Sequence, residues 1–137
     1  WDSEAKGRRL TDAQLSAELQ RWLGTVRPQR IWIDPSAASF ITQLRHDGIR
    51  TWAADNSVID GIQDVSTLLG AGRLKIHESC TGLIEEMGTY VWDEKAQARG
   101  EDKPLKQNDH GCDALRYAVR GLRRVWRPWI VAEKGAA

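Results

Sequence analysis

Apolar residues recur along this chain at the two spacings that distinguish helices from buried strands. Apolar positions three or four residues apart predict amphipathic helices. These helices cover residues 11–23, 37–46, 57–69, 79–91 and 109–124. Short apolar runs predict strands at residues 31–33, 50–54 and 73–76. The first of these strands shows no polar alternation, so we expect it to be buried on both faces of a parallel sheet.

The order of these elements favours one fold class. Helices and strands alternate as α-β-α-β-α-β-α, followed by a loop and a last helix. Such alternation predicts an α/β fold in which helices pack on a mainly parallel sheet. Residues 93–106 are charged and carry a glycine and a proline, so we expect an exposed loop or hairpin there. Residues 126–137, which contain Pro128, are expected to form a linker-like tail.

The first helix has the clearest predicted boundaries. Thr11 followed three residues later by Gln14 forms a capping box, and Gly24 and Pro28 end the helix. The last helix has an apolar face that we expect to be buried. Its residues are Leu115, Ala118, Val119 and Leu122.

Composition limits the possible functions only in part. The chain has 137 residues, 41% of them apolar, which is enough for one modest domain. Lysine and arginine (20) nearly balance aspartate and glutamate (19), so there is no overall basic charge, although residues 116–134 form a basic C-terminal face. Cys80 and Cys112 are too few for a secreted disulfide framework and are expected to be buried, reduced thiols. No apolar run reaches the roughly 18 residues that span a bilayer.

The candidate chemistry centres on residues 106–117, K-Q-N-D-H-G-C-D-A-L-R-Y. Asp109 and Asp113 are four residues apart and His110 precedes Asp113 by three, so a helix places all three near one face. Asn108 or Asp109 can cap the helix. Carboxylates grouped in this way suit a divalent cation. The alternative is an ordinary acidic helix start, which the helix dipole favours without any ligand.

A second candidate is Asp34, which follows the apolar strand at residues 31–33. Strand ends are where chemistry gathers in α/β folds, although an Asx-Pro turn explains the same residue type. Asp113 would be costly to bury without a cation or an arginine such as Arg116. His110 either orients Asp113, or activates a metal-bound water, or is an exposed histidine at a helix start.

Two other hypotheses carry less weight. A zinc site is disfavoured, because the one-residue gap between His110 and Cys112 is too tight and a helix points these side chains apart. The residues it requires are His77, Cys80, His110 and Cys112. The seven tryptophans suggest a base-stacking platform, but we expect most of them to pack in the core. Trp126 and Trp129, which lie beside arginines, are the exceptions.

Four strings in order resemble one known family, the C-terminal nuclease domain of the large terminase subunit of tailed bacteriophages. They are I-D-P-S-A at residues 33–37, N-S-V-I-D-G-I at 56–62, Y-V-W-D at 90–93 and N-D-H-x-x-D-A-L-R-Y at 108–117. The resemblance covers residues 8–122. It implies an RNase H-like fold with a central mixed or parallel sheet flanked by helices. It also implies a metal-dependent endonuclease that cuts concatemeric double-stranded viral DNA during genome packaging.

The resemblance assigns a role to each candidate residue. Asp34 and Asp113 correspond to catalytic acids that bind two Mg²⁺ or Mn²⁺ ions, with Asp109 as a further ligand and His110 as an accessory catalytic residue. Hard oxygen ligands select these ions over softer metals. The implied partners are double-stranded DNA and, in the longer protein, an ATPase domain, the portal and the small terminase subunit. The implied location is the host cytoplasm, with no membrane.

The chain departs from the family at its start. The family's domain begins with a strand that carries the first catalytic aspartate, and this chain begins too late to contain it. No G-x-x-x-x-G-K-[ST] loop for ATP is present either. We therefore expect residues 1–125 to be a partial nuclease domain with impaired cleavage, and 126–137 a C-terminal tail. The alternatives are a non-catalytic remnant that binds DNA or a packaging partner through the basic face, or another RNase H-like nuclease of the resolvase or transposase type.

Overall fold

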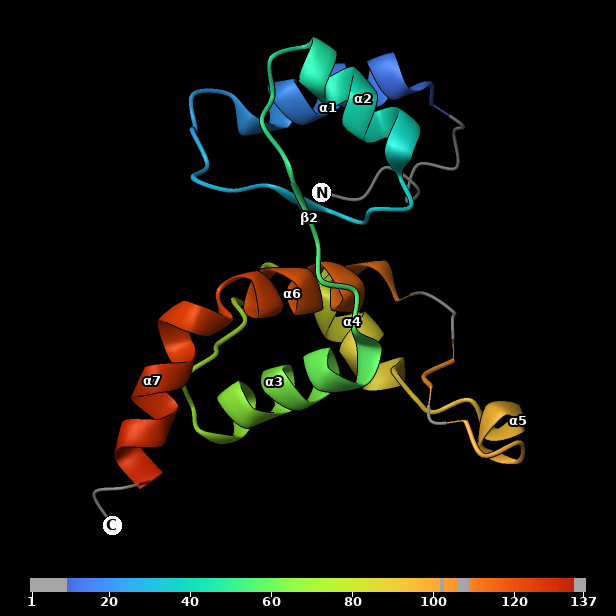
Figure 1. Cartoon of the computed structure of the whole chain (residues 1–137), viewed down its shortest axis with the longest axis vertical. Helices are drawn as coiled ribbons and strands as arrows, with labels where there is room; N and C mark the ends of the chain where they lie inside the picture. The colour runs from blue at the N-terminus through green and yellow to red at the C-terminus, as the bar shows by residue number, and fades with distance from the viewer. Residues whose placement is uncertain (1–9, 102, 106–108, 135–137) are drawn as a thin grey trace. The chain divides into compact units, whose positions relative to one another are not determined.

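The chain is divided into two compact units in this computed structural model, Trp1–Ala54 and Asp55–Ala137 (Figure 1). The structure describes residues 10–101, 103–105 and 109–134, with side chains as far as residue 130. No helix of the described residues is long and apolar enough to cross a membrane.

The first unit contains α1 (Asp12–Leu23), β1 (Trp32–Ile33), α2 (Ala38–His46) and β2 (Trp52–Ala53). The predicted capping box is confirmed. The Thr11 hydroxyl accepts a 3.3 Å hydrogen bond from the Gln14 backbone N–H, and the Gln14 side chain accepts one of 2.9 Å from the Thr11 N–H. Gly24, with φ of 53°, ends the helix by donating its N–H to the Gln20 carbonyl.

The two strands of this unit pair in parallel, with Trp32 opposite Trp52 and Ile33 opposite Ala53. Helix α2 makes the connection between them, as parallel pairing requires. Both residues of β1 are half-buried, so the prediction that this strand is buried on both faces is wrong. The short sheet has only two strands among the described residues, which leaves part of each strand uncovered.

Helices α1 and α2 pack together in the first unit. Their contact buries Leu19 and the fully inaccessible Leu44. It also buries Ser16 completely, and the Ser16 hydroxyl donates a 2.6 Å hydrogen bond to the Asp47 carboxylate just after α2. The buried hydroxyl is therefore satisfied rather than orphaned.

The second unit is helical. Its elements are α3 (Val58–Gly70), α4 (Thr81–Thr89), α5 (Glu94–Gln97), α6 (His110–Gly121) and α7 (Arg123–Lys134). Helix α6 is central, because α3, α4 and α7 all contact it (Figure 1). Leu68, Val119 and Ile130 form the core of this unit, from three different helices.

The strand predicted at residues 73–76 is absent, and these residues are irregular. The backbone N–H groups of Arg73 and Leu74 both donate to the Leu68 carbonyl, at 2.9 and 3.1 Å. They close the end of α3, together with Gly72 at φ of 66°. Donors already used in a helix-ending turn cannot pair with a neighbouring strand, so the apolar run does not become one.

The C-terminal region also differs from the prediction. The last predicted helix is broken after Gly121, and the expected linker at residues 126–134 is helical, as part of α7. Pro128 lies inside α7 at the cost of one helical hydrogen bond. Burial of Ile130 and packing of Trp126 against the core offset that cost. Leu122, at the break, is 44% exposed instead of buried.

Several other burial predictions are wrong. Trp22 and Trp92 are 63% and 42% exposed, so these two tryptophans are not core residues, whereas Trp129, one of the two exceptions, is 69% exposed. Cys80 is exposed, whereas Cys112 is buried as expected. The predicted loop or hairpin at residues 93–106 contains the short helix α5 and an antiparallel bridge between Trp92 and Pro104, as in a hairpin.

Candidate functional site

The start of α6 carries three of the four residues predicted to do chemistry. Asp109, immediately before the helix, is 9% exposed, Asp113 is half-buried and His110 is exposed. Asp109 occupies the N-cap position, one of the two predicted, but its side chain makes no capping hydrogen bond. The other candidate cap, Asn108, lies outside the described residues.

The cap comes instead from Glu86, on α4. Its Oε2 atom accepts hydrogen bonds from the backbone N–H groups of Gly111, at 2.7 Å, and Cys112, at 3.0 Å. A carboxylate in this place satisfies two unpaired donors and interacts favourably with the helix dipole. Sequence reasoning missed Glu86, because no local signal links a residue in the middle of one helix to the start of another.

Gly111 makes this contact possible. A Cβ atom at this position would lie 2.9 Å from Oε2 of Glu86, which is closer than real Cβ contacts allow. The glycine therefore permits the close approach of the carboxylate. Its helical backbone conformation plays no part in the requirement, since any residue could adopt it.

Asp113 pairs with Arg116. The sequence analysis named this arginine as one of the two possible partners of Asp113, the other being a cation. The Arg116 Nη2 atom donates to Oδ1 of Asp113 at 2.5 Å, and Arg116 is only 4% exposed. Burial alone lowers the pKa of a guanidinium, but the hydrogen bond and charge of Asp113 raise it, and the net pKa of Arg116 is raised. Arg116 therefore stays charged at neutral pH, and its hydrogen bond orients the Asp113 carboxylate.

The surroundings of Arg116 are closely packed. A Cβ atom on Gly61 of α3 would lie 3.1 Å from Cδ of Arg116, so the glycine lets α3 approach α6. Two of the four sequence strings, at residues 56–62 and 108–117, therefore meet at this helix contact. The Nε atom of Arg116 and the hydroxyl of Tyr90 are buried without a hydrogen-bond partner among the described residues.

The buried thiol of Cys112 lies close to several carboxylates at the start of α6. Burial is the main cause that raises the pKa of the Cys112 thiol to about 11, and the carboxylates of Glu86, Asp113 and Asp109 raise it further. The thiol is consequently protonated at neutral pH and is not a nucleophile. The same negative potential favours a bound cation.

Asp34 belongs to the first unit, where it follows β1. Its Oδ1 atom accepts a 2.8 Å hydrogen bond from the Ser36 backbone N–H, and its carbonyl accepts one of 3.0 Å from Ala37. The Asx turn that was the alternative explanation of this residue is therefore present. The turn also fixes the carboxylate at the C-terminal end of the strand, so the two explanations are compatible.

The side chains assembled at these positions fit a metal ion in kind but not in number. Carboxylate oxygens are the ligands that Mg²⁺ and Mn²⁺ prefer. Within residues 10–101, 103–105 and 109–130, however, no group of three or more His, Cys, Asp or Glu side chains is placed to hold a metal. The described residues of neither unit therefore form a complete metal site by themselves.

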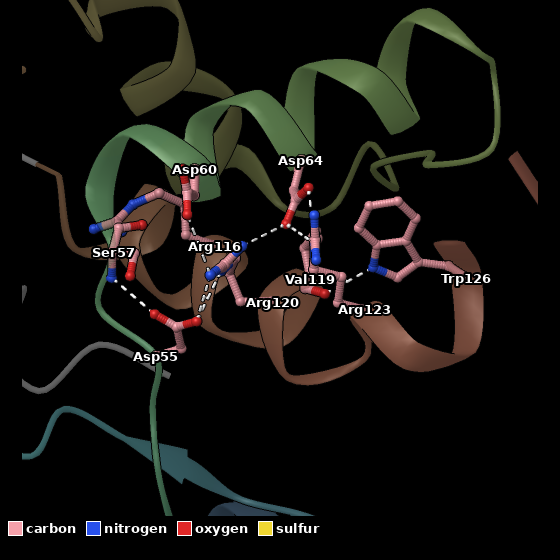
Figure 2. Close-up of polar contacts among 9 residues, drawn as sticks. All are labelled: Asp55, Ser57, Asp60, Asp64, Arg116, Val119, Arg120, Arg123 and Trp126. Carbon is pink, nitrogen blue, oxygen red and sulfur yellow. Dashed lines mark hydrogen bonds and ion pairs between the residues drawn. The ribbon is translucent and has the colours of Figure 1, made fainter. Parts of the chain in front are cut away.

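A network of ion pairs joins residues 55–64, which include the start of α3, to the last turn of α6 and the start of α7 (Figure 2). The Arg120 guanidinium lies 2.5 Å from the Asp55 carboxylate, 3.0 Å from Asp64 and 3.6 Å from Asp60. Arg123 contacts Asp64 at 3.1 Å. The predicted basic C-terminal face is therefore partly neutralised.

The chain is similar to known proteins of one family. The model of the terminase RNase H-like domain matches residues 3–121. The terminase large subunit of Escherichia phage T5 is 33% identical over 118 residues, which are 83% of this chain and 27% of that protein. The solved structure of the large terminase from a thermophilic bacteriophage is 40% identical, with a TM-score of 0.81 over 89% of this chain and 31% of that one.

A second structure of that thermophilic phage terminase, in complex with ATP-gamma-S, gives a TM-score of 0.79 at 41% identity, over 87% of this chain and 31% of the other. The chain thus spans about a third of the length of these relatives. The sequence strings, the contact between α3 and α6 and the likeness to the solved structures all indicate the same family. This chain belongs to the family of terminase RNase H-like domains.

Proposed function

We propose that this chain is the nuclease part of a large terminase subunit, which cleaves concatemeric double-stranded DNA during genome packaging. The observation that carries the proposal is the start of α6, where Asp113 is oriented by Arg116 in a member of the terminase RNase H-like family. Residues 1–125 are proposed to belong to this domain. Because a family fold alone does not indicate a function, the proposal rests on the oriented Asp113 carboxylate at the position of the motif.

Asp34 and Asp113 are the proposed principal metal ligands, with Asp109 as a third. The proposed metal is Mg²⁺ or Mn²⁺, in a two-metal site, and when bound it supplies charge stabilisation and a more acidic water. Arg116 holds the Asp113 carboxylate in one orientation. His110 is exposed at the same helix end and is proposed to accept a proton from water.

The proposed partners follow from the longer relatives. They are double-stranded DNA and, in the whole protein, an ATPase domain, the portal and the small terminase subunit. The proposed location is the cytoplasm of the bacterial host, where packaging substrates occur.

Calorimetric titration with Mn²⁺, paired with cleavage of supercoiled plasmid, tests this proposal. We expect Mn²⁺ to bind and Asp113→Asn to weaken that binding and remove any nicking. Unchanged Mn²⁺ affinity in the variant would contradict the assigned site. Asp60→Asn is the matched control, because it removes an exposed carboxylate near the same helix.

A non-catalytic DNA-binding role is the second candidate. It is favoured by Arg124, Arg127 and Trp129, which are exposed on α7. Binding of labelled duplex in a chelating buffer, with no Mn²⁺ binding and no nicking, would support this role over the first.

A further inference from the structure

The first unit contains a cleft of about 550 Å³, and no candidate catalytic residue is among the described residues that line it. Its walls come from the loop between α1 and β1, from the turn at Gly48, and from Arg50 and Trp52. Strands β1 and β2 are parallel and begin at this edge, so the cleft lies at their N-terminal ends. Asp34 follows β1 at the opposite end.

Two arginines stack on one tryptophan at this cleft. The guanidinium carbons of Arg30 and Arg50 lie 5.0 and 4.8 Å from the centre of a Trp52 ring. Both arginines are exposed, and no carboxylate of the described residues forms an ion pair with either. Stacking orients a guanidinium by its face and leaves the N–H donors at its edge for another acceptor.

Arg27 and Arg50 line the cleft, and Arg30 lies beside it through its contact with the lining residue Trp52. The Arg27 Nη1 atom donates to the carbonyls of Gly24, at 3.1 Å, and Val26, at 3.2 Å, so its own loop holds it in place. No aspartate or glutamate is among the described residues that line the cleft. Three positive charges gathered without a counter-charge repel one another, and a bound polyanion relieves that repulsion.

The distance to Asp34 limits what the polyanion can be. Arg30 and Asp34 are four residues apart, so even a fully extended chain separates their Cα atoms by no more than about 14 Å. Duplex DNA rises about 3.4 Å per base pair, which makes this span about four base pairs. A duplex that passes Asp34 can therefore reach Arg30 within about four base pairs.

We propose that this cleft binds the phosphate backbone of double-stranded DNA, within about four base pairs of Asp34 and apart from the cleavage chemistry. The choice of DNA as the polyanion rests on the proposed function. Guanidinium groups bind phosphate oxygens through two parallel hydrogen bonds, which suits Arg30 and Arg50, both stacked on Trp52. Such contacts fix the position of the duplex without reading its sequence.

The test is the affinity of the whole chain for a fluorescently labelled duplex, by anisotropy, in a chelating buffer that prevents cleavage. The double variant Arg30→Gln, Arg50→Gln should bind at least tenfold more weakly near 100 mM salt, as loss of two phosphate contacts predicts, and the slope of log K against log salt should fall by about two. The control pair is Arg21→Gln, Arg45→Gln, exposed arginines away from the cleft. It should change the affinity less than threefold.

Unchanged affinity in the cleft variant, or an equal loss in the control pair, would overturn the proposal. The pair Arg30→Lys, Arg50→Lys keeps both charges but not the planar stacking. It should keep the salt slope and bind several-fold more weakly, and wild-type affinity here would contradict the role of Trp52. Competition by ATP or inorganic phosphate through the same two arginines, with duplex binding unaffected, would assign the cleft to a free phosphate ligand and overturn the proposal for DNA.

The outcome is independent of the nuclease assay. Mn²⁺ binding and plasmid nicking test Asp34 and Asp113, and the cleft variant should leave Mn²⁺ affinity unchanged. Loss of duplex binding with intact Mn²⁺ binding thus concerns the cleft alone. Failure of Mn²⁺ binding with normal duplex binding concerns the proposed catalytic function alone.

Discussion

The carboxylate of Glu86 accepts a 2.7 Å hydrogen bond from the backbone N–H of Gly111, 25 positions further along the chain. This bond fixes the helix end that carries Asp109, His110 and Asp113. The start of α6 is therefore stabilised by a side chain from another helix, while the aspartate at its own N-cap position makes no cap. Because the Asp109 side chain makes no capping hydrogen bond, its carboxylate oxygens are not used by the helix end.

Glu86→Ala should destabilise the second unit by about 1–2 kcal/mol, because two backbone donors lose their acceptor and the helix dipole loses its charge. The measurement is urea unfolding followed by circular dichroism. Glu85→Ala, the neighbouring exposed residue, should change the free energy of unfolding by less than about 0.5 kcal/mol. Equal effects of the two substitutions would show that Glu86 is not the cap.

Gly111→Ala should also destabilise the protein, because the new methyl group displaces the Glu86 carboxylate. The carboxylate end can move away, so the expected cost is the loss of the two capping hydrogen bonds and of the charge at the helix start, which together outweigh the gain of about 1 kcal/mol that alanine brings to a helix. Gly88→Ala on α4 is the matched control, since nothing lies within 4 Å of a Cβ there. That control should be stabilising, and a stabilising Gly111→Ala would contradict the crowding.

Asp113→Asn should cost about 1–3 kcal/mol of unfolding free energy, because Arg116 is left buried with a weaker, uncharged acceptor. Asp60→Asn, whose carboxylate is 63% exposed and 3.6 Å from Arg120, should cost less than about 1 kcal/mol. Thermal unfolding of the two variants measures both. A loss of Mn²⁺ affinity in Asp113→Asn while the protein is still folded then reports on the metal site, separately from stability.

The pKa of Asp47 is lowered to about 2, mainly by the hydrogen bond from Ser16 and then by Gln43 and His46. A lowered carboxyl pKa stabilises the fold above the unfolded value of 3.8, and that stabilisation is lost as the pH falls from about 4 to 2. Ser16→Ala should raise the pKa of Asp47 towards 3.8, as measured by carboxyl NMR titration. The difference in unfolding free energy between Ser16→Ala and the unchanged protein should become smaller below pH 3. A difference that stays constant across the acid range would contradict this linkage.

Comparison of predicted and observed elements shows where sequence patterns suffice. The helices at residues 11–23 and 57–69 are observed within one residue at each end, because caps and apolar spacing act within a few turns. The pairing of Asp113 with Arg116 was also predictable, since three residues along a helix bring two side chains together. The family followed from four short strings and is confirmed by the match over residues 3–121.

Tertiary structure decided what local spacing leaves open. The sequence alone determined most helices, the chemical nature of the candidate site and the family. Packing decided that Glu86 caps α6, that Arg120 meets three acids of another segment, that residues 73–76 close a helix, and that residues 126–134 form one. The physical reason is distance along the chain. Contacts within a turn follow from backbone geometry, whereas contacts between distant helices depend on which surfaces bury together.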